Sequence, residues 1–277
     1  MRIFTIVIMH YHHKVDIFSY PKCRHFNGAG IMNRWYNKVA VVTGASSGIG
    51  AATVSKLVDS GLRVVGLARR KERLTALQKT LEGRAGTFFP IVADVSKEQD
   101  VLDAFNWVTQ NVDVIHVLVN CAGVMPTSSL LDGETSQWKE ILDTNLLGMC
   151  ITTREAIKIM RENKIDGHVV HIKSVGGQRV PCLPDLSVYP ASKFGVTALT
   201  ETLRQELNAI GSKIKISSVS PGVVNTELVP EGKLLNIIKA QSALQPEDIA
   251  EAVAYILGTP PHVQVHELTI MPLGQTV

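Results

Sequence analysis

A tyrosine and a lysine four residues apart, Tyr189 and Lys193, are the side chains in this sequence best suited to proton transfer. Pro190 predicts that a helix begins here, because proline is favoured in the first helical turn. Positions i and i+4 share one helix face, so the ammonium group would lie near the phenol and favour its ionised form. The pair therefore predicts an acid/base group, although the spacing alone is weak evidence without further motifs.

A glycine-rich stretch from Thr43 to Gly50 follows a valine-rich run and precedes a segment with helical spacing. Glycines in such a turn let the backbone approach a pyrophosphate, whose charge the helix N-terminus stabilises. A turn used only for packing is the alternative, but the position between strand and helix favours a dinucleotide. The cofactor-binding residues predicted here are Gly44, Ser46, Ser47, Gly48, Ile49 and Gly50.

Two arginines, Arg69 and Arg70, stand after the second valine-rich run, where an NAD-dependent protein would usually carry an acidic residue. A guanidinium group suits a 2′-phosphate, so this position predicts NADP(H), bound mainly through Arg69. A solvated helix start is the alternative, but cations are unfavourable at a helix N-terminus.

Short apolar runs alternate with segments at helical spacing from position 38 onward, which is typical of a parallel sheet covered on both faces. The sequence therefore predicts an α/β fold, a single doubly wound Rossmann domain with a seven-stranded parallel sheet flanked by helices. The expected strands are Val39 to Thr43, Arg63 to Leu67, Thr87 to Val92, Val114 to Val119, His168 to Ile172, Lys215 to Ser218 and Gln264 to Ile270. The expected helices are Ile49 to Ser60, Lys71 to Leu81, Lys97 to Asn111, Ser136 to Asn163, Pro190 to Ile210 and Pro246 to Leu257.

Composition and charge narrow the class of protein. The chain has 277 residues, 45% hydrophobic and 19% charged, as expected of a globular protein with one sizeable core. Removing the four basic residues and one acidic residue of positions 1–31 from the totals of 28 and 25 leaves 24 of each, so the remainder offers a nucleic acid no electrostatic support. The four cysteines are scattered, which predicts a reduced, cytoplasmic protein with no disulfide and no metal site.

The segment 1–31 differs from the rest and is expected to be an unstructured extension, with the folded domain covering 32–277. Its apolar run from Ile3 to Met9 is far too short to span a bilayer, so no transmembrane segment is expected. Three alternatives stay open for this segment: a weak membrane or import signal, a histidine-rich metal site, or upstream sequence read through to a start at Met32.

Taken in order, these motifs resemble the short-chain dehydrogenase/reductase family over essentially the whole chain from Lys38. The resemblance implies hydride transfer between a nicotinamide and an alcohol or carbonyl carbon, with proton exchange at the oxygen. It implies that Tyr189 is the acid/base, that Lys193 lowers its pKa from about 10 and holds the ribose, and that Ser174 donates to the substrate oxygen. Asn145 would position a water for proton relay, with an ordinary structural role as the alternative.

The same resemblance implies further cofactor contacts along the chain. Asp94 would bind the adenine edge, although it could equally cap a helix, and Thr226 would help to anchor the nicotinamide amide. The remaining cofactor residues implied are Val95, Asn120, Ala122, Gly123, Pro221, Gly222 and Val224, besides Tyr189 and Lys193.

Two residues depart from the family pattern. Cys121 replaces a second asparagine and is expected to be a small packed residue, since no activating neighbour is visible. Lys173 directly precedes Ser174, and strand alternation predicts that it points away from the serine hydroxyl.

The substrate side is predicted to be apolar, with Arg179 the only side chain there that could readily bind an anion. Whole segments resemble a farnesol dehydrogenase-like subgroup, related to dehydrogenase/reductase member 11, which implies isoprenoid alcohols such as farnesol, or keto-steroids, and a homodimer or homotetramer. A catalytically silent NADPH-binding regulatory protein is the alternative, and a hydrolase or isomerase lacks a visible nucleophile with an adjacent base. The residues expected at the substrate are Val180, Leu183, Leu186, Leu228, Val229, Leu234, Leu235 and Ile238.

Overall fold

Seven parallel strands form one sheet in the order β3-β2-β1-β4-β5-β6-β7. The computed structural model describes residues 32–228, 236 and 242–275. The strands are β1 Val39–Thr43, β2 Arg63–Ala68, β3 Thr87–Val92, β4 Ile115–Asn120, β5 His168–Ile172, β6 Lys215–Pro221 and β7 Glu267–Ile270. The helices are η1 Asn33–Trp35, α2 Gly48–Asp59, α3 Lys71–Leu81, α4 Glu98–Asn111, α5 Thr135–Leu142, η2 Asp143–Leu147, α6 Gly148–Glu162, η3 Val175–Gly177, α7 Tyr189–Ala209 and α9 Pro246–Gly258.

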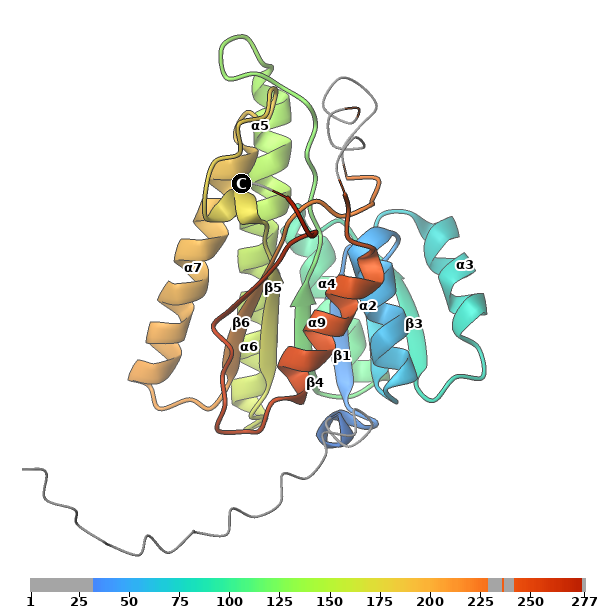
Figure 1. The fold of residues 1–277 in the computed structure, drawn as a ribbon. Helices are drawn as coiled ribbons and strands as arrows, with labels where there is room; N and C mark the ends of the chain where they lie inside the picture. Colours follow the sequence, from blue (N-terminus) through green and yellow to red (C-terminus); the bar gives the residue numbers. More distant parts are fainter. Residues whose placement is uncertain (1–31, 229–235, 237–241, 276–277) are drawn as a thin grey trace, which may run out of the picture.

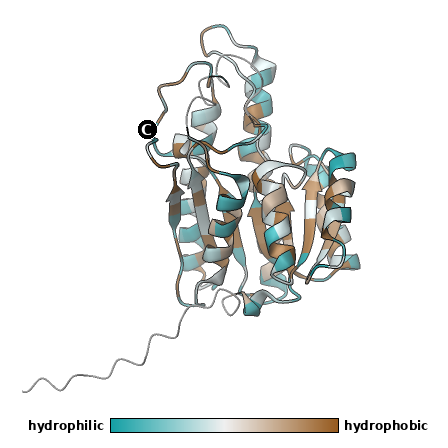
Figure 2. Ribbon diagram, turned by 45° about the vertical axis from the view of Figure 1, so that its right-hand side comes forward, coloured by the Kyte–Doolittle hydropathy of each residue, from teal (hydrophilic) through white to brown (hydrophobic). Residues whose placement is uncertain are grey.

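Helices cover both faces of the sheet, as the uninterrupted apolar strands require. Buried residues of α2, α3 and α9 pack against one face, where Leu57 and Ile249 are fully buried. Buried residues of α4, α6 and α7 pack against the other, where Phe105 and Met160 meet the strands. Figure 1 shows α2 and α9 side by side in front of the sheet, and Figure 2 shows the apolar residues concentrated along the strands. The predicted doubly wound fold is confirmed.

The order in which successive strands are added to the sheet reverses between β1 and β4. Strand β1 pairs with β2 on one side and with β4 on the other, so the connections leave in opposite directions from this point. Ligands of open α/β sheets bind at such a switch point, outside the carboxyl ends of the strands. The glycine turn after β1 and the Asn120–Gly123 turn after β4 lie there together.

The helix expected from Ser136 to Asn163 is wrong as one regular helix. Helices α5 and α6 are separated by a π-helical segment, η2, that contains Asn145. A π segment widens the helix by one residue and is common at functional sites. Its side chains make contacts that a hydrophobic pattern does not report, because Asn145 bonds the backbone of Val124 on a separate loop.

The edge strand β7 is shorter than expected at its start, and its partner β6 is longer. Gln264 does not enter the strand, because its side chain instead donates to the carbonyl of Ile216. Strand β6 continues to Pro221, which pairs with Ile270. The expectations for segment 1–31 lie outside the described residues. No helix in the described ranges is both long and apolar enough to cross a membrane.

Two leucines, one buried and one exposed, test whether the core seen in the structure stabilises the fold. Leu118 in β4 is 0% exposed, whereas Leu131 in a surface loop is 97% exposed. We expect Leu118→Ala to lower the free energy of unfolding by about 2–5 kcal/mol, because it removes buried methyl groups and leaves a cavity. Leu131→Ala should change it by less than about 0.5 kcal/mol in the same denaturant titration. Equal effects of the two substitutions would contradict the position of the core.

Candidate active site

A cavity of about 430 Å³ opens at the carboxyl ends of the strands. It is bordered by the loops that follow β1, β2, β3, β4 and β6, and by the first turn of α7. Of the predicted residues, those on its wall are Gly44, Ser46, Ser47, Gly48, Ile49, Gly50, Arg69, Arg70, Asp94, Val95, Ala122, Gly123, Tyr189, Lys193 and Thr226. Motifs that are more than a hundred residues apart in sequence therefore share one cavity.

The glycine turn has no room for larger residues at two positions. Gly44 has a φ of +70°, and a Cβ there would lie 2.9 Å from the backbone of Ala122. A Cβ on Gly50 would overlap the carbonyl of Gly44. Helix α2 begins at Gly48 on the cavity wall, so its N-terminal backbone N–H groups face the cavity. This end of the helix can hold an anion such as a pyrophosphate.

The two arginines after β2 differ in their partners. Arg70 donates to the hydroxyls of Ser46 and Ser47 and forms an ion pair with Glu227 at 3.2 Å. Arg69 is exposed on the cavity wall and forms no ion pair within the described ranges. Arg70 thus stabilises the glycine turn, and the guanidinium group of Arg69 is available to bind a ligand.

The floor of the cavity is held from below by buried polar groups. The Thr43 hydroxyl accepts hydrogen bonds from the backbone N–H groups of Cys121 and Ala122, both at 3.0 Å. Asn120 is predicted to contact the cofactor, but its side chain turns away from the cavity. It donates to Thr153 at 2.8 Å and accepts from Thr152 at 2.7 Å, so it anchors the floor to α6.

Asp94 lies on the cavity wall after β3 without capping the next helix. Its carboxylate accepts from the backbone N–H and the hydroxyl of Ser96, at 3.1 and 2.8 Å. Helix α4 takes Lys97 as its N-cap, so the helix-cap alternative for Asp94 is not what the structure shows.

Helix α7 begins at Tyr189, as the Pro190 signal predicts. The Tyr189 ring is 7% exposed and packs with Met125 and Leu186. Burial raises the pKa of the phenol to about 12, and a hydrogen bond with Ser174 lowers it. The Ser174 hydroxyl also accepts from the Gly176 backbone N–H at 3.0 Å, which leaves its own hydrogen available to donate.

Lys193 lies one turn further along α7, buried beside the same cavity. Its ammonium group is 5.6 Å from the centroid of the Tyr189 ring and donates to the carbonyl of Ile172 at 3.4 Å. The pKa of Lys193 is lowered to about 8, mainly by burial; Cys121 acts to raise it, and the positive charge of Lys173 acts to lower it. The contact that lowers the pKa of the Tyr189 phenol is the hydrogen bond with Ser174, whereas the Lys193 ammonium group lies over the ring.

Asn145 faces the turn after β4 from the π-helical segment. Its side-chain oxygen accepts from the Val124 N–H at 2.8 Å, and its amide donates to the Val124 carbonyl at 3.0 Å. A cavity of about 10 Å³ lies between Asn145, Lys193 and Asn120. Gly123 lies close to the side chains of both Asn145 and Lys193, because a Cβ added at this glycine would come within 4 Å of each.

The segment after β6 reaches the cavity at Thr226, Glu227 and Leu228. Thr226 also packs against Gly48, because a Cβ added to Gly48 would lie 3.0 Å from the threonine methyl. The Gly222 N–H donates to the carbonyl of Ile270, and Val224 forms a β-bridge with Leu244, so both residues make backbone contacts between segments. Pro221 ends β6 away from the cavity.

Both departures from the family pattern have a structural explanation. Burial raises the pKa of Cys121 to about 12, so its thiol is neutral and packed, as predicted. Lys173 points away from the Ser174 hydroxyl, and its ammonium group pairs with Glu267 at 2.5 Å.

The expected substrate residues divide into three groups. Leu183 and Leu186 pack with Tyr189, and Leu228 lines the cavity. Val180 is 63% exposed and stays outside. The predictions for Val229, Leu234, Leu235 and Ile238 lie outside the described residues.

Several residues on the cavity wall carry no recognisable sequence motif. Met125 and Pro126 follow the Asn120–Gly123 turn, and only this place in the sequence could have indicated that they line the cavity. Glu140, Thr144 and Glu227 come from α5, the π segment and the loop after β6, where helical periodicity or turn composition gives no indication of the cavity. The described part of the chain contains no cluster of three metal-ligating side chains.

Comparisons with known proteins agree with this geometry. The sequence profile described as short chain dehydrogenase matches residues 38–233. The chain is 50% identical to a farnesol dehydrogenase of Aedes aegypti, over 88% of this chain and 99% of that protein. It is 44% identical to dehydrogenase/reductase SDR family member 11 of Bos taurus, again over 88% of this chain and 99% of the relative.

Solved structures of similar fold include NADP complexes. An alcohol dehydrogenase from Thermococcus sibiricus complexed with 5-hydroxy-NADP matches with a TM-score of 0.76 and 27% identity, over 87% of this chain and 98% of that one. A closed serine dehydrogenase complexed with NADP+ matches with a TM-score of 0.79 and 28% identity, over 86% and 96%. The protein described here is therefore an oxidoreductase that belongs to the short chain dehydrogenase family.

Proposed function

We propose that this protein is an NADP(H)-dependent alcohol dehydrogenase or carbonyl reductase that acts on apolar alcohols or ketones. The observation that carries the proposal is that Tyr189, which is hydrogen-bonded to Ser174, and Lys193 line the same cavity as the N-terminus of α2 and Arg69. An acid/base group and an anion-binding site in one cavity are what a reaction with a phosphorylated hydride carrier needs.

The residues present fit such a cofactor. Gly44 and Gly50 keep the turn free of side chains, and α2 offers its N-terminus to a pyrophosphate. Arg69 would bind the 2′-phosphate, Asp94 the adenine edge, and Lys193 the ribose hydroxyls, with Thr226 near the glycine turn. When bound, NADP(H) supplies or accepts the hydride.

Proton transfer is the task of Tyr189. In the reductive direction the phenol donates its proton to the carbonyl oxygen as negative charge develops there, and the Ser174 hydroxyl stabilises that oxygen by donating a hydrogen bond. Because Ser174 accepts from Gly176, its own hydrogen is available to donate, either to the Tyr189 oxygen or to a substrate oxygen beside it. In the oxidative direction the same groups work in reverse.

Asn145 would help to return a proton to the Tyr189 phenol after each reduction. The cavity of about 10 Å³ between Asn145 and Lys193 has the size of a single water and polar walls, which suits a bridging water. Asn145 therefore has two roles in this proposal: it fixes the Val124 loop and borders the proton route.

The substrate class follows from the apolar wall and from the relatives. Met125, Leu183, Leu186 and Leu228 lie beside Tyr189 or on the cavity wall, so a hydrophobic alcohol is the best fit. The 50% identical relative is a farnesol dehydrogenase, which makes isoprenoid alcohols such as farnesol the first substrates to test, followed by keto-steroids.

We further propose a cytoplasmic homodimer or homotetramer, built from a domain over 32–277 after an extension over 1–31. A hollow of about 830 Å³ between α6 and α7, lined by Met149, Ile157 and Leu203 among others, offers apolar surface for a second copy. Pairing of these long helices would cover it.

Replacing Tyr189 tests the acid/base assignment. We expect Tyr189→Phe to keep NADPH binding within about twofold but to lower kcat by about a hundredfold to ten-thousandfold, because it removes the proton donor. Tyr255→Phe on the exposed side of α9 is the matched control and should leave kcat unchanged. The assay is steady-state turnover of farnesol and a panel of alcohols and ketones with both cofactors.

Two results would contradict this assignment. Turnover by Tyr189→Phe equal to that of the wild type would remove the phenol from the mechanism. No turnover by the wild type across the panel, together with intact NADPH binding, would favour the silent NADPH-binding protein instead.

Replacing Arg69 tests the choice of cofactor. We expect Arg69→Ala to raise the Kd for NADPH by about tenfold or more and to leave that for NADH within about twofold, because a charge-assisted contact to the 2′-phosphate is lost. Arg84→Ala, which removes an exposed partner of Asp59 far from the cavity, should change neither value. An equal loss for NADH and NADPH would show that Arg69 does not bind the 2′-phosphate.

A further inference from the structure

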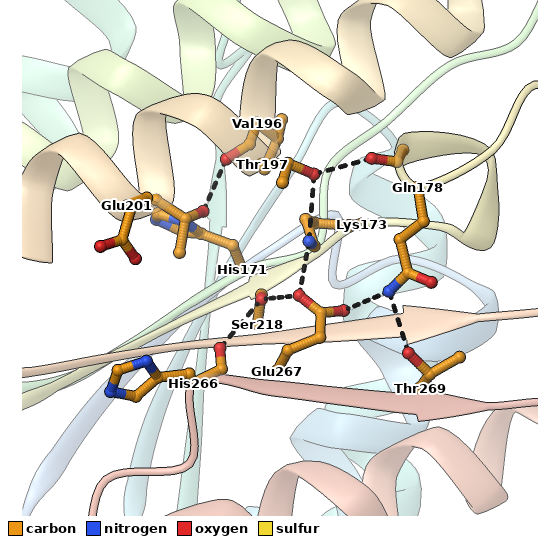
Figure 3. A network of polar contacts seen from close by, with 12 residues as sticks. His171, Lys173, Gln178, Val196, Thr197, Glu201, Ser218, His266, Glu267 and Thr269 are labelled. Carbon is orange, nitrogen blue, oxygen red and sulfur yellow. Dashed lines mark hydrogen bonds and ion pairs between the residues drawn. The ribbon is translucent and has the colours of Figure 1, made fainter.

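One carboxylate holds both ends of the turn that carries Ser174. Glu267, the first residue of β7, accepts from the Lys173 ammonium group at 2.5 Å through one oxygen. Its other oxygen accepts from the side-chain amide of Gln178 at 3.0 Å. Lys173 directly precedes Ser174 and Gln178 directly follows η3, so the two ends of this turn meet at Glu267 (Figure 3).

The same contacts reach the helix turn that carries Lys193. Thr197 lies one turn beyond Lys193 on α7 and accepts from Lys173 at 3.1 Å. Its hydroxyl lies 3.0 Å from the carbonyl of Gly177 and 3.2 Å from that of Lys193, as hydrogen-bond donor. A Cβ on Gly177 would overlap the Lys193 backbone, so the Ser174 turn and α7 are in direct contact.

The ion pair at the centre of these contacts is buried at its lysine end. The Lys173 side chain is 1% exposed and that of Glu267 is 33% exposed. Burial raises the pKa of Glu267, but hydrogen bonds from Lys173 and Ser218 outweigh it and hold the pKa below its usual value. Glu267 also accepts from Ser218 at 2.5 Å, and Gln178 donates to Thr269 at 2.9 Å. A buried charge that loses its partner is costly, so the two residues depend on each other.

We propose that the Lys173–Glu267 ion pair is a positioning device that fixes the Ser174 hydroxyl relative to Tyr189, with Glu267 as its anchor on β7. This inference rests on the proposed function, in which Ser174 stabilises the substrate oxygen. It explains why a lysine stands beside the catalytic serine: the Lys173 ammonium group is buried and paired with Glu267, so its task in this proposal is placement. Small displacements of such a group reduce rates strongly, because hydrogen bonds to a transition state need accurate placement.

The test compares substitutions in the Lys173–Glu267 pair with the same two substitutions in an exposed ion pair. Lys173→Met and Glu267→Gln should each lower kcat by about tenfold, with NADPH Kd and substrate KM changed by less than about threefold. Lys56→Met and Glu251→Gln break an exposed pair of the same chemistry between α2 and α9 and should leave all three values unchanged. The substrate is the panel compound that the wild type converts fastest.

Two further variants separate positioning from simple instability. Glu267→Asp keeps the charge and should retain more kcat than Glu267→Gln at equal thermal stability. In the double variant Lys173→Met/Glu267→Gln the loss in kcat should be smaller than the product of the single losses, because each residue acts through the other. A kcat within twofold of the wild type in folded Lys173→Met and Glu267→Gln would overturn the proposal, as would fully multiplicative losses.

Hydrogen exchange of residues 174–178 keeps this inference separate from the proposed function. Faster exchange of these amides in Lys173→Met, with unchanged exchange in Lys56→Met, is expected whether or not a substrate is found. Unchanged exchange at 174–178 in a folded Lys173→Met protein would overturn the positioning role. Absence of turnover in the wild type would instead count against the proposed function alone.

Discussion

Parallel pairing of β1 with both β2 and β4 is the constraint on which the rest of this structure depends. It gathers the carboxyl ends of the strands at one edge and puts the glycine turn beside the Asn120–Gly123 turn. Thr43 then joins the two turns through hydrogen bonds to Cys121 and Ala122. Without this pairing the N-terminus of α2 and the first turn of α7, which carries Tyr189, would not share a cavity.

Placement of the reactive groups falls to residues that do not react. Tyr189 and Lys193 are buried, so burial pushes their pKa values in opposite directions, to about 12 and about 8. The hydrogen bond that lowers the pKa of the phenol comes from Ser174, whose hydroxyl accepts from Gly176. In our proposal, Glu267 of the edge strand β7 holds Ser174 in place through Lys173 and Gln178.

Much of this could be predicted from the sequence, because strands, glycine turns and the Tyr189 helix start are written in local patterns. The seven strands, the order of elements and the direction of Lys173 away from the Ser174 hydroxyl follow from alternation and turn residues. Long-range polar contacts could not be predicted: nothing local shows that Lys173 meets Glu267, that Asn120 turns toward α6, or that a π segment interrupts the helix at Asn145. Such contacts join residues that are far apart in the sequence, so no local pattern of residue types indicates them.

The pH dependence of kcat for alcohol oxidation, in the wild type and in Ser174→Ala, tests the central claim most directly. Oxidation needs the ionised phenol, so kcat rises with pH through the apparent pKa of Tyr189. Because the Ser174 hydrogen bond lowers that pKa, its loss should move the rising limb to higher pH as well as lower the plateau. A limb at the same pH in both proteins would contradict the account, since Ser174 would then not act on the ionisation of Tyr189.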